Sequence, residues 1–404
     1  MAAIQNPAGE SMLEAHQNCK QLYDEGVPLY TKAHIRDIED QLRDPETNVF
    51  TLNRIDGNTT TQGVQPRPGA MRLVDFFTYQ EMVQDTMTSR PFPYCSYAVT
   101  SIYRQQSQWD KPGGVPQPDD IARHVNGNQA VPALGLNGMS TTDRTYSRWH
   151  SAFQGATMEW ENSKSCQRLQ QRLARAFEIV PAQWAKINKI VCFALGEPSN
   201  DIQPRMMQHA MITTIADMIS ERFGTNVRKL TQDPGYSEIT KDCLRIHGFG
   251  VIDTPGLVSG YLEIDNNSIV VSIYLPQPIK QMIADLARPL MIITNAIIPD
   301  TPENRFIERD ALKFAESPRT REMWQDYYNE SIFVREADDR NFRSWSPGLQ
   351  VMWREVHPKR GDKKNADPDP DADDDDDDGD NDSIAGSERS YDDFVPAPPE
   401  PDWV

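Results

Sequence analysis

The stretch from Ile187 to Asn295 constrains the fold of this chain more than any other. It contains short apolar runs that each end at Gly, Pro, Asp or Asn, and segments with helical periodicity separate these runs. Short continuous apolar runs are typical of strands buried in a parallel sheet, where the loops at the C-terminal ends of the strands carry the functional groups. The stretch therefore predicts strands and helices in alternation.

We expect five strands, joined mainly by helices. The predicted strands are Ile190–Leu195, Val227–Thr231, Gly250–Asp253, Ile269–Leu275 and Leu290–Thr294. The predicted helices are Pro204–Phe223, Glu238–His247 and Ile279–Leu286. Alternation at this spacing favours right-handed crossovers and a mostly parallel sheet that is covered on both faces. The predicted fold class is an α/β, Rossmann-like three-layer sandwich.

Composition divides the rest of the chain around this core. We assign residues 1–106 to a mainly helical N-terminal extension and residues 107–150, which are rich in Pro, Gly and Asn, to a flexible insertion. The α/β domain itself is expected at 151–300. An aromatic-rich helical extension is expected at 301–358, and an acidic, disordered tail at 359–404.

Shorter patterns predict local structure outside the central stretch. Helical spacing of apolar residues indicates helices near Met12–Leu22 and at Lys32–Leu42. Asn53–Gly69 is interpreted as a polar loop, and Leu73–Val83 as a helix. Glu159–Glu178 is strongly amphipathic, which favours packing on the sheet over a basic nucleic-acid-binding helix.

Charge is distributed unevenly along the 404 residues. The net charge is −19, and the segment from Lys359 to the end contributes −12 of it, because it holds 17 acidic and 5 basic residues. The remaining −7 leaves no basic excess, which argues against a general nucleic-acid binder. The tail is interpreted either as a solubilising segment or as a docking segment for basic protein partners.

The cysteines indicate a protein of a reducing compartment. The histidines and cysteines show no pattern of a metal site. The five cysteines are scattered, with no C-x-x-C pair, and the seven histidines are equally dispersed. The sequence contains no run of 18 apolar residues, so it predicts no transmembrane helix. The first residues lack the features of a secretory signal. We expect a cytoplasmic or nuclear location and no membrane partner.

Polar residues collect where the predicted strands end. Ligands bind outside the carboxyl ends of strands in open parallel sheets. Gly196 allows a sharp turn, and Ser199 precedes a helix whose first N–H groups could hold an anion. Asp233 stands where a ribose-binding acid often stands, although the first loop lacks G-x-G-x-x-G and Asp233 is equally a turn former. His209 is interpreted as a packing residue, and no catalytic nucleophile–base–acid set is recognisable.

Several of these residues fall in an order that resembles the SRR-like family, whose name stands for sensitivity to red light reduced. The similar segments are VCFALGEPS, MMQHA, TQDPGYSEITKDCLRIHGFGVID, IVVSIYLPQP and PLMIITNAI. The matching positions are Leu195-Gly196, Ser199, Gln208, Asp233-Pro234, Leu244 with Gly248, Pro276 and Asn295. The family usually has His after Pro276, but this chain has Gln277, which forms hydrogen bonds and does not titrate. The extensions resemble those of fungal members.

The resemblance implies a regulatory protein. Members of the family are linked to light signalling and circadian regulation in plants, and to control of haem biosynthesis in animals and yeast. We therefore expect a non-catalytic protein that holds a small ligand or a partner through Gly196, Ser199, Gln208, Asp233, Gln277 and Asn295, with no cofactor identified. Two alternatives remain: a nucleotide- or S-adenosylmethionine-dependent transferase, and an acidic-tail interaction protein.

Overall fold

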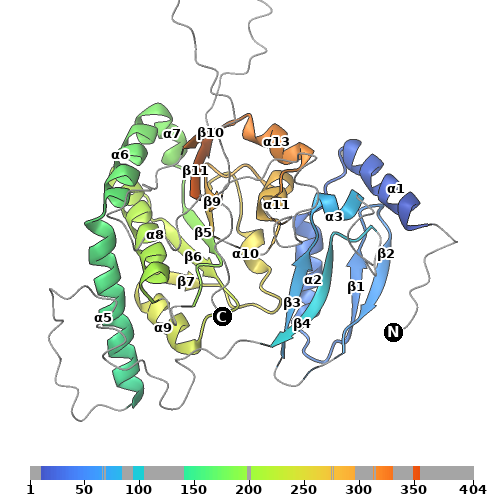
Figure 1. The fold of residues 1–404 in the computed structure, drawn as a ribbon, viewed down its shortest axis with the longest axis horizontal. Coiled ribbons are helices and arrows are strands. Elements are labelled where there is room, and N and C mark those ends of the chain that lie inside the picture. The colour runs from blue at the N-terminus through green and yellow to red at the C-terminus, as the bar shows by residue number, and fades with distance from the viewer. Residues whose placement is uncertain are drawn as a thin grey trace, which may run out of the picture. The chain divides into compact units, whose positions relative to one another are not determined.

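A seven-stranded sheet lies at the centre of the computed structural model, with the strand order β10-β11-β9-β8-β5-β6-β7 (Figure 1). The neighbours from β9 to β7 are parallel, whereas β11 runs antiparallel to both β9 and β10. The structure describes residues 11–65, 67, 70–83, 94–103, 141–197, 202–273, 275, 277–295, 313, 315–330 and 349–354. The strands of the sheet are β5 (Lys189–Phe193), β6 (Arg228–Gln232), β7 (Phe249–Val251), β8 (Ser268–Ser272), β9 (Met291–Asn295), β10 (Tyr327–Glu330) and β11 (Leu349–Arg354).

The predicted α/β fold with a mostly parallel sheet is confirmed, and the five predicted strands match β5 to β9. Every residue of β5, β8 and β9 is buried, which explains why these strands are continuous apolar runs rather than alternating ones. The helices between them are α8 (Ile202–Phe223), α9 (Glu238–Ile246), the short α10 (Ser259–Leu262) and α11 (Ile279–Leu286). Sequence periodicity thus located α8, α9 and α11 but not the short α10.

Helices α5 to α9 share one hydrophobic core with the first face of the sheet. Three of these helices precede the sheet: α5 (Thr141–Glu161), α6 (Lys164–Ile179) and α7 (Pro181–Trp184), which lies just before β5. Ile190 and Cys192 of β5 belong to this core, together with the apolar stripe of α8. The predicted helix over 159–178 is interrupted, because the side chain of Ser163 caps a new helix start by accepting a hydrogen bond from the N–H of Cys166 at 3.0 Å.

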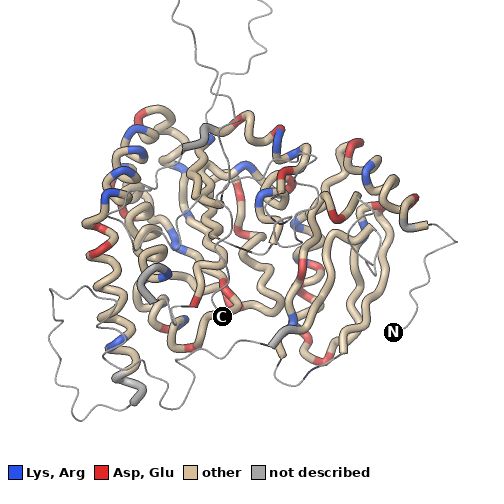
Figure 2. Tube along the Cα trace, in the orientation of Figure 1, with Lys and Arg blue, Asp and Glu red and all other residues tan. Residues whose placement is uncertain are grey.

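Helix α6 is amphipathic, as predicted. Cys166, Leu169, Leu173 and Phe177 are buried in the core with the sheet. Lys and Arg recur along its length in Figure 2, and the side chains of Arg168 and Arg175 are exposed. The apolar stripe therefore accounts for the packing of the helix, and the basic residues occupy its outer side.

The N-terminal part of the chain covers the second face. Helices α1 (Met12–Asp24) and α2 (Lys32–Leu42) form where the sequence predicted them. Residues 1–106 were expected to be mainly helical. That expectation is wrong where two pairs of antiparallel strands form. The elements concerned are β1 (Val49–Asn53), β2 (Thr59–Gly63), β3 (Ala70–Phe76), the short α3 (Tyr79–Val83) and β4 (Tyr97–Tyr103).

The hairpins explain two incorrect interpretations. The range Asn53–Gly69 is not simply a loop, because its polar Thr residues pair with β1 along an exposed strand. The range Leu73–Val83 is half strand and half helix, because Leu73 to Phe76 pair with β4. Cross-strand pairing outweighed local helical spacing in both segments.

The C-terminal extension also differs from expectation. Residues 301–358 were expected to be helical, yet only α13 (Pro318–Trp324) is a helix among the described residues of this range. Strand β11 pairs with β9 through the backbone, and its side chains alternate between the two cores of the sheet. Burial on both faces favours a strand for this apolar run.

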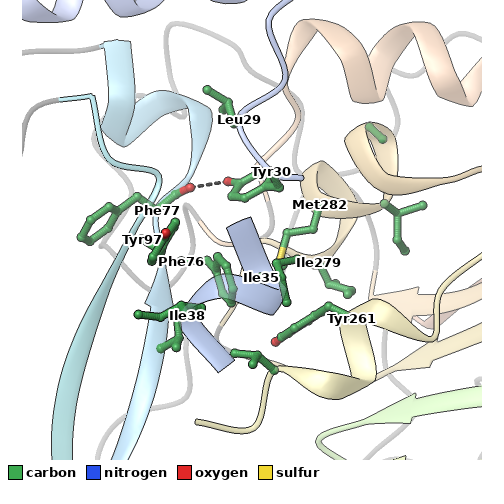
Figure 3. Packing of buried hydrophobic residues seen from close by; sticks show 14 of the residues in the cluster. Leu29, Tyr30, Ile35, Ile38, Phe76, Phe77, Tyr97, Tyr261, Ile279 and Met282 are labelled. Atoms are coloured by element: carbon green, nitrogen blue, oxygen red, sulfur yellow. Dashed lines mark hydrogen bonds between the residues drawn. The ribbon is translucent and has the colours of Figure 1, made fainter. Parts of the chain in front are cut away.

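Figure 3 shows how the second face is packed. Phe76 of β3, Ile35 and Ile38 of α2, and Tyr261 of α10 belong to one buried cluster, and Phe76 meets Tyr261 edge-on with ring centroids 5.3 Å apart. The hydroxyl of Tyr30 donates to the backbone carbonyl of Phe77. The N-terminal segments are therefore part of the core that buries the sheet.

Polar contacts fix the same layer in place. The carboxylate of Asp285 on α11 accepts hydrogen bonds from the backbone N–H groups of Leu29 and Tyr30, at 2.8 and 3.1 Å. It also forms an ion pair with Arg319 of α13 at 2.8 Å. Burial raises the pKa of Asp285, and these bonds act in the opposite direction. Three segments that are distant in the sequence thus meet at one carboxylate.

Two of the predicted ranges fall largely outside this description. Residues 107–140 of the expected insertion and the whole expected tail, 359–404, are not among the described residues, whereas α5 begins at Thr141, inside the range assigned to the insertion. All five cysteines are described, and each is a buried free thiol. Of the helices in the described ranges, none combines the length and the apolar character that crossing a membrane requires.

Candidate functional site

The loop after β5 carries a tightly turned backbone at the C-terminal edge of the sheet. Ala194 and Gly196 both adopt positive φ angles, 54° and 81°. A β-carbon at Gly196 would lie 2.9 Å from Cδ of Arg205, so glycine is required there for space as well as for conformation. A left-handed alanine costs about 1 kcal/mol, and such strain persists only where surrounding contacts hold it.

Asp233, just after β6, supplies those contacts. Its Oδ2 atom accepts a hydrogen bond from the N–H of Gly196, and its Oδ1 atom accepts one from the N–H of Gly235, both at 2.7 Å. The second bond is the Asx-turn that the sequence made plausible. Asp233 therefore ties the first loop to the second, and both of its oxygens are bonded to backbone groups of the protein.

Glu197, the residue after Gly196, also links the loop after β5 to the segment after β6. This buried carboxylate accepts bonds from the N–H and Oγ of Ser237, at 2.9 and 3.0 Å, and from Oγ1 of Thr240 at 2.9 Å. Ser237 is the N-cap of α9, so a negative charge lies at the positive end of that helix. The backbone carbonyl of Glu197 also accepts a bond from Arg205 of α8.

A buried chain of polar groups links α8 to β6. The Nδ1 atom of His209 lies 2.8 Å from the carbonyl oxygen of Arg205, and its Nε2 atom lies 2.9 Å from the hydroxyl of Tyr236. That hydroxyl is also 2.8 Å from Oγ1 of Thr231. Because a carbonyl only accepts, Nδ1 carries the proton, Tyr236 donates to Nε2, and Thr231 donates to Tyr236.

Burial keeps the side chains of His209 and Tyr236 uncharged. It lowers the pKa of His209 to about 4, against a smaller opposite effect of the bond to Arg205. It also raises the pKa of Tyr236, and the charge of Asp233 adds to that effect. Both ring nitrogens of His209 are occupied within the protein, so His209 is a packing residue, as the sequence predicted.

The loop after β7 closes over the end of β6. Gln232 donates to the carbonyl of Leu257 at 2.6 Å and accepts from the N–H of Gly260 at 2.9 Å. A β-carbon at Gly260 would lie 2.7 Å from the ring of Phe193, which leaves no room for a larger residue. The ring of Tyr261 stacks on Phe193 with centroids 4.9 Å apart.

The predicted site residues do not all meet in one place. Gly196 and Asp233 are in contact. Ser199 lies outside the described residues. Gln277 accepts a hydrogen bond from the N–H of Phe76 at 2.9 Å, so it ties the sheet to the N-terminal layer. Asn295 ends β9, two strands away from β5, which is on the order of 10 Å across a sheet.

Gln208 differs from the other candidates. It is 4 % exposed on α8, and its Oε1 atom is buried without a hydrogen-bond partner. Gln208, Ile212, Ile215 and Ile219 recur at helical spacing, and the three isoleucines belong to the core with the sheet. The side-chain amide thus lies on the stripe of α8 that faces the strands.

Sequence reasoning missed the most connected residues of this region. Glu197 and Tyr236 follow predicted strands but were given no role, and Ser237 and Thr240 were not considered. The pattern from Ser237 to Thr240 has the spacing of a helix cap, which was the available signal. Among the described residues, three or more His, Cys, Asp or Glu side chains do not gather as metal ligands would.

Comparison with known families identifies the chain. The profile of the SRR1 domain matches residues 166–367, which is half of the sequence. The chain therefore belongs to the SRR1 domain family, as the resemblance indicated. The match includes the sheet from β5 to β11 but begins after α5 and the N-terminal layer.

Comparisons with individual proteins add little to this. No curated protein matches the sequence. The crystal structure of the plantazolicin methyltransferase BpumL, in complex with a monoazolic desmethylPZN analogue and SAH, aligns with 54 % of this chain and with 100 % of its own. The identity is 10 % and the TM-score 0.21, and a similarity at this level carries no argument about function.

Proposed function

We propose that this SRR1 domain protein is a regulatory protein that binds, without transforming, a small ligand or a partner segment at the C-terminal edge of its sheet. One observation carries the proposal: the acids at the end of β5 and β6 bond to the backbone and to helix α9. Asp233 and Glu197 order the two loops, and a preorganised loop lowers the entropic cost of binding. The family's links to light signalling and haem-biosynthesis control support the regulatory part.

Ligand screening by thermal unfolding tests the binding part. We expect stabilisation by one member of a set comprising nucleotides, S-adenosylmethionine and haem, and we expect Asp233→Ala to lose it. Asp265→Ala is the matched control, because Asp265 forms the same kind of turn at the opposite edge of the sheet, where its Oδ1 accepts from Asn267 at 2.9 Å. If no compound stabilises the protein, and Asp233→Ala leaves partner capture intact, the proposal fails.

A transferase remains the second candidate, and the strand order favours it. Numbered along the chain from β5, the parallel strands have the order 3-2-1-4-5, and their order reverses between β5 and β8. This order resembles that of doubly wound folds, in which nucleotides bind at the reversal, and it supports the candidate to that extent. The two backbone bonds of Asp233 weigh against this candidate, because a ribose would compete with them. Mass spectrometry of the denatured protein tests it, since a resident cofactor would appear as an adenine-containing species.

The acidic tail supports a third proposal, based on sequence alone. Residues 359–404 carry a net charge of −12, which suits basic protein partners in the cytoplasm or nucleus. Deleting these residues should abolish capture of such partners and leave the unfolding temperature of the remainder unchanged. Unchanged capture would leave the tail as a solubilising segment.

A further inference from the structure

Helix α5 packs against α9 through one stripe of its surface. Tyr146, Trp149, His150 and Phe153 recur at intervals of three and four residues, which places their side chains on one face of the helix. Trp149 and Phe153 are buried in the core that α5 shares with α8 and α9. The family match begins at residue 166, after α5 has ended. The stripe therefore joins a helix outside the family profile to a helix inside it.

Two hydrogen bonds fix the position of α5 along α9. The hydroxyl of Tyr146 donates to a carboxylate oxygen of Asp242 at 2.9 Å. One turn later, the Nδ1 atom of His150 lies 2.9 Å from the Nε2 atom of His247, so one ring donates and the other accepts. The ring of His247 also packs on Phe153, with ring centroids 4.3 Å apart. A shift of α5 along α9 would break these contacts.

Trp149, which lies between Tyr146 and His150 on the stripe, continues the hydrogen bonding toward the strand ends. Its indole Nε1–H donates to Oγ1 of Thr240 at 3.3 Å, and both side chains are fully buried. The same hydroxyl donates its proton to Oε1 of Glu197 at 2.9 Å. A hydroxyl has one proton to donate and accepts through its lone pairs, so the bonds run from Trp149 to Thr240 to Glu197.

The carboxylate that ends this series of bonds belongs to the loop after β5. Glu197 directly follows Gly196 and also accepts from the N–H and Oγ of Ser237. Hydrogen bonds to an ionised acceptor are stronger than neutral ones, and bonds in series polarise one another. The indole of Trp149 therefore strengthens the bond that Thr240 donates to Glu197, and through it the hold on the loop.

We propose that Trp149 is a positioning residue for the ligand site at the C-terminal edge of the sheet, acting through Thr240 on Glu197. This inference rests on the proposed binding function and adds its regulation. The docking of α5 on α9 sets the order of the loop after β5, so a change in the position of α5 changes the affinity of that edge. Coupling between two sites is reciprocal, so a ligand that the loop holds also tightens α5 on α9.

Amide hydrogen exchange of the full-length protein, resolved to single residues, tests this coupling. Trp149→Phe keeps an aromatic ring and removes the indole donor. We expect the amide of Ser237, which donates to Glu197, to exchange about three- to tenfold faster, as the loss of one hydrogen bond predicts. Amides of the buried strand β5 report global unfolding and should change less. Thr240→Val should act like Trp149→Phe, whereas Thr240→Ser, which keeps the hydroxyl, should retain the protection of Ser237.

Trp160→Phe is the matched control. Trp160 lies on the same helix, is equally buried, and donates its Nε1–H to Oγ1 of Thr214 at 2.9 Å. Thr214 donates in turn to the carbonyl of Ala210 within α8, at 3.3 Å, and not to a loop at the strand ends. This variant should leave the exchange of Ser237 relative to β5 unchanged. Equal effects of the two tryptophan substitutions, or equal acceleration at Ser237 and in β5, would overturn the inference.

Binding measurements separate this inference from the proposed function. The probes are nucleotides, S-adenosylmethionine and haem. For a probe or captured partner that Asp233→Ala no longer binds, we expect Trp149→Phe to bind about three- to tenfold more weakly than the wild type, and Trp160→Phe to bind as the wild type does. Unchanged binding in Trp149→Phe would overturn the inference and leave the proposed function standing. If no probe binds and partner capture is independent of Asp233, both fall.

Discussion

The two halves of the sheet's C-terminal edge differ in how their polar groups are hydrogen-bonded. At β5 and β6, Asp233 and Glu197 provide acceptors for the exposed backbone and helix-cap donors, so that half is closed by the protein itself. At β8 and β11, the hydroxyl of Ser272 and the Oε1 atom of Gln350 are buried without a hydrogen-bond partner among the described residues. The comparison teaches that the half resembling a cofactor loop in sequence is ordered by hydrogen bonds within the protein, whereas the other half contains buried polar atoms without a partner among the described residues.

Removing the carboxylate of Glu197, which lies at the N-terminus of α9, should have the largest effect on stability. Glu197→Ala leaves three donors on Ser237 and Thr240 without their carboxylate, and we expect a loss of about 4 kcal/mol in the free energy of unfolding. Urea denaturation measures it. Glu238→Gln, on the same helix, is the control, since its carboxylate is exposed and its pair with Lys241 contributes little. Equal losses in the two variants would show that the hydrogen bonds of Glu197 to Ser237 and Thr240 do not stabilise the fold.

Acid should weaken the same half through His209. Its pKa is about 4 in the folded protein and near 6.5 when it is unfolded, so the unfolded chain binds the proton first. This stabilisation is complete above pH 6.5 and is lost as the pH falls toward 4, by up to roughly 3 kcal/mol. We expect a shallower pH dependence in His209→Gln, measured as the unfolding free energy at several pH values. Identical slopes would place His209 in a solvated environment instead.

The turn at Gly196 should give a smaller loss. Gly196→Ala combines a positive φ with contact to Arg205, and we expect destabilisation by about 1–2 kcal/mol. The same substitution at Gly155, in the middle of α5 with open space around it, should instead stabilise by about 0.5–1 kcal/mol. Thermal unfolding of the two variants compares them directly, and the same sign in both would contradict the strained turn.

The smallest effect is expected in the other half of the edge. Ser272→Ala removes a hydroxyl without a hydrogen-bond partner among the described residues, so the unfolding free energy should stay within about 0.5 kcal/mol or rise slightly. Chemical denaturation measures this change. A loss of more than about 1 kcal/mol would mean that the hydroxyl already has a structural partner, and the contrast between the halves would disappear.

The central layer of the fold could be read from the sequence because its strands are buried on both faces. Continuous apolar runs such as Ile190–Phe193 carry that signal within themselves. The hairpin of β3 and β4 could not be read in the same way. Leu73 and Val74 suit a helix or a strand equally, and only pairing with residues about 25 positions later decides between them.

The sequence predicted that Gly196 and Asp233 lie at the same sheet edge, but not the hydrogen bonds that the candidate residues form. Strand-end logic found Gly196 and Asp233, and the two are indeed bonded to each other. The sequence could not show that Asp233 spends both oxygens on backbone N–H groups, nor that Gln277 reaches Phe76 in the N-terminal layer. It also could not show that the Ser272 hydroxyl has no partner among the described residues, because this depends on the register of the two neighbouring strands.

The layer contributed by α1 to β4 has a consequence for how this chain can be divided. The family match begins at residue 166, yet residues from Ala15 to Val99 bury one face of the matched sheet. Asp285, well inside the match, depends on Leu29 and Tyr30 for two of its hydrogen bonds. A fragment cut at the family boundary would expose that face and leave the carboxylate without these partners. The unit that folds is therefore larger than the segment that the family profile matches, and any relative that lacks these residues needs other residues to cover the same face.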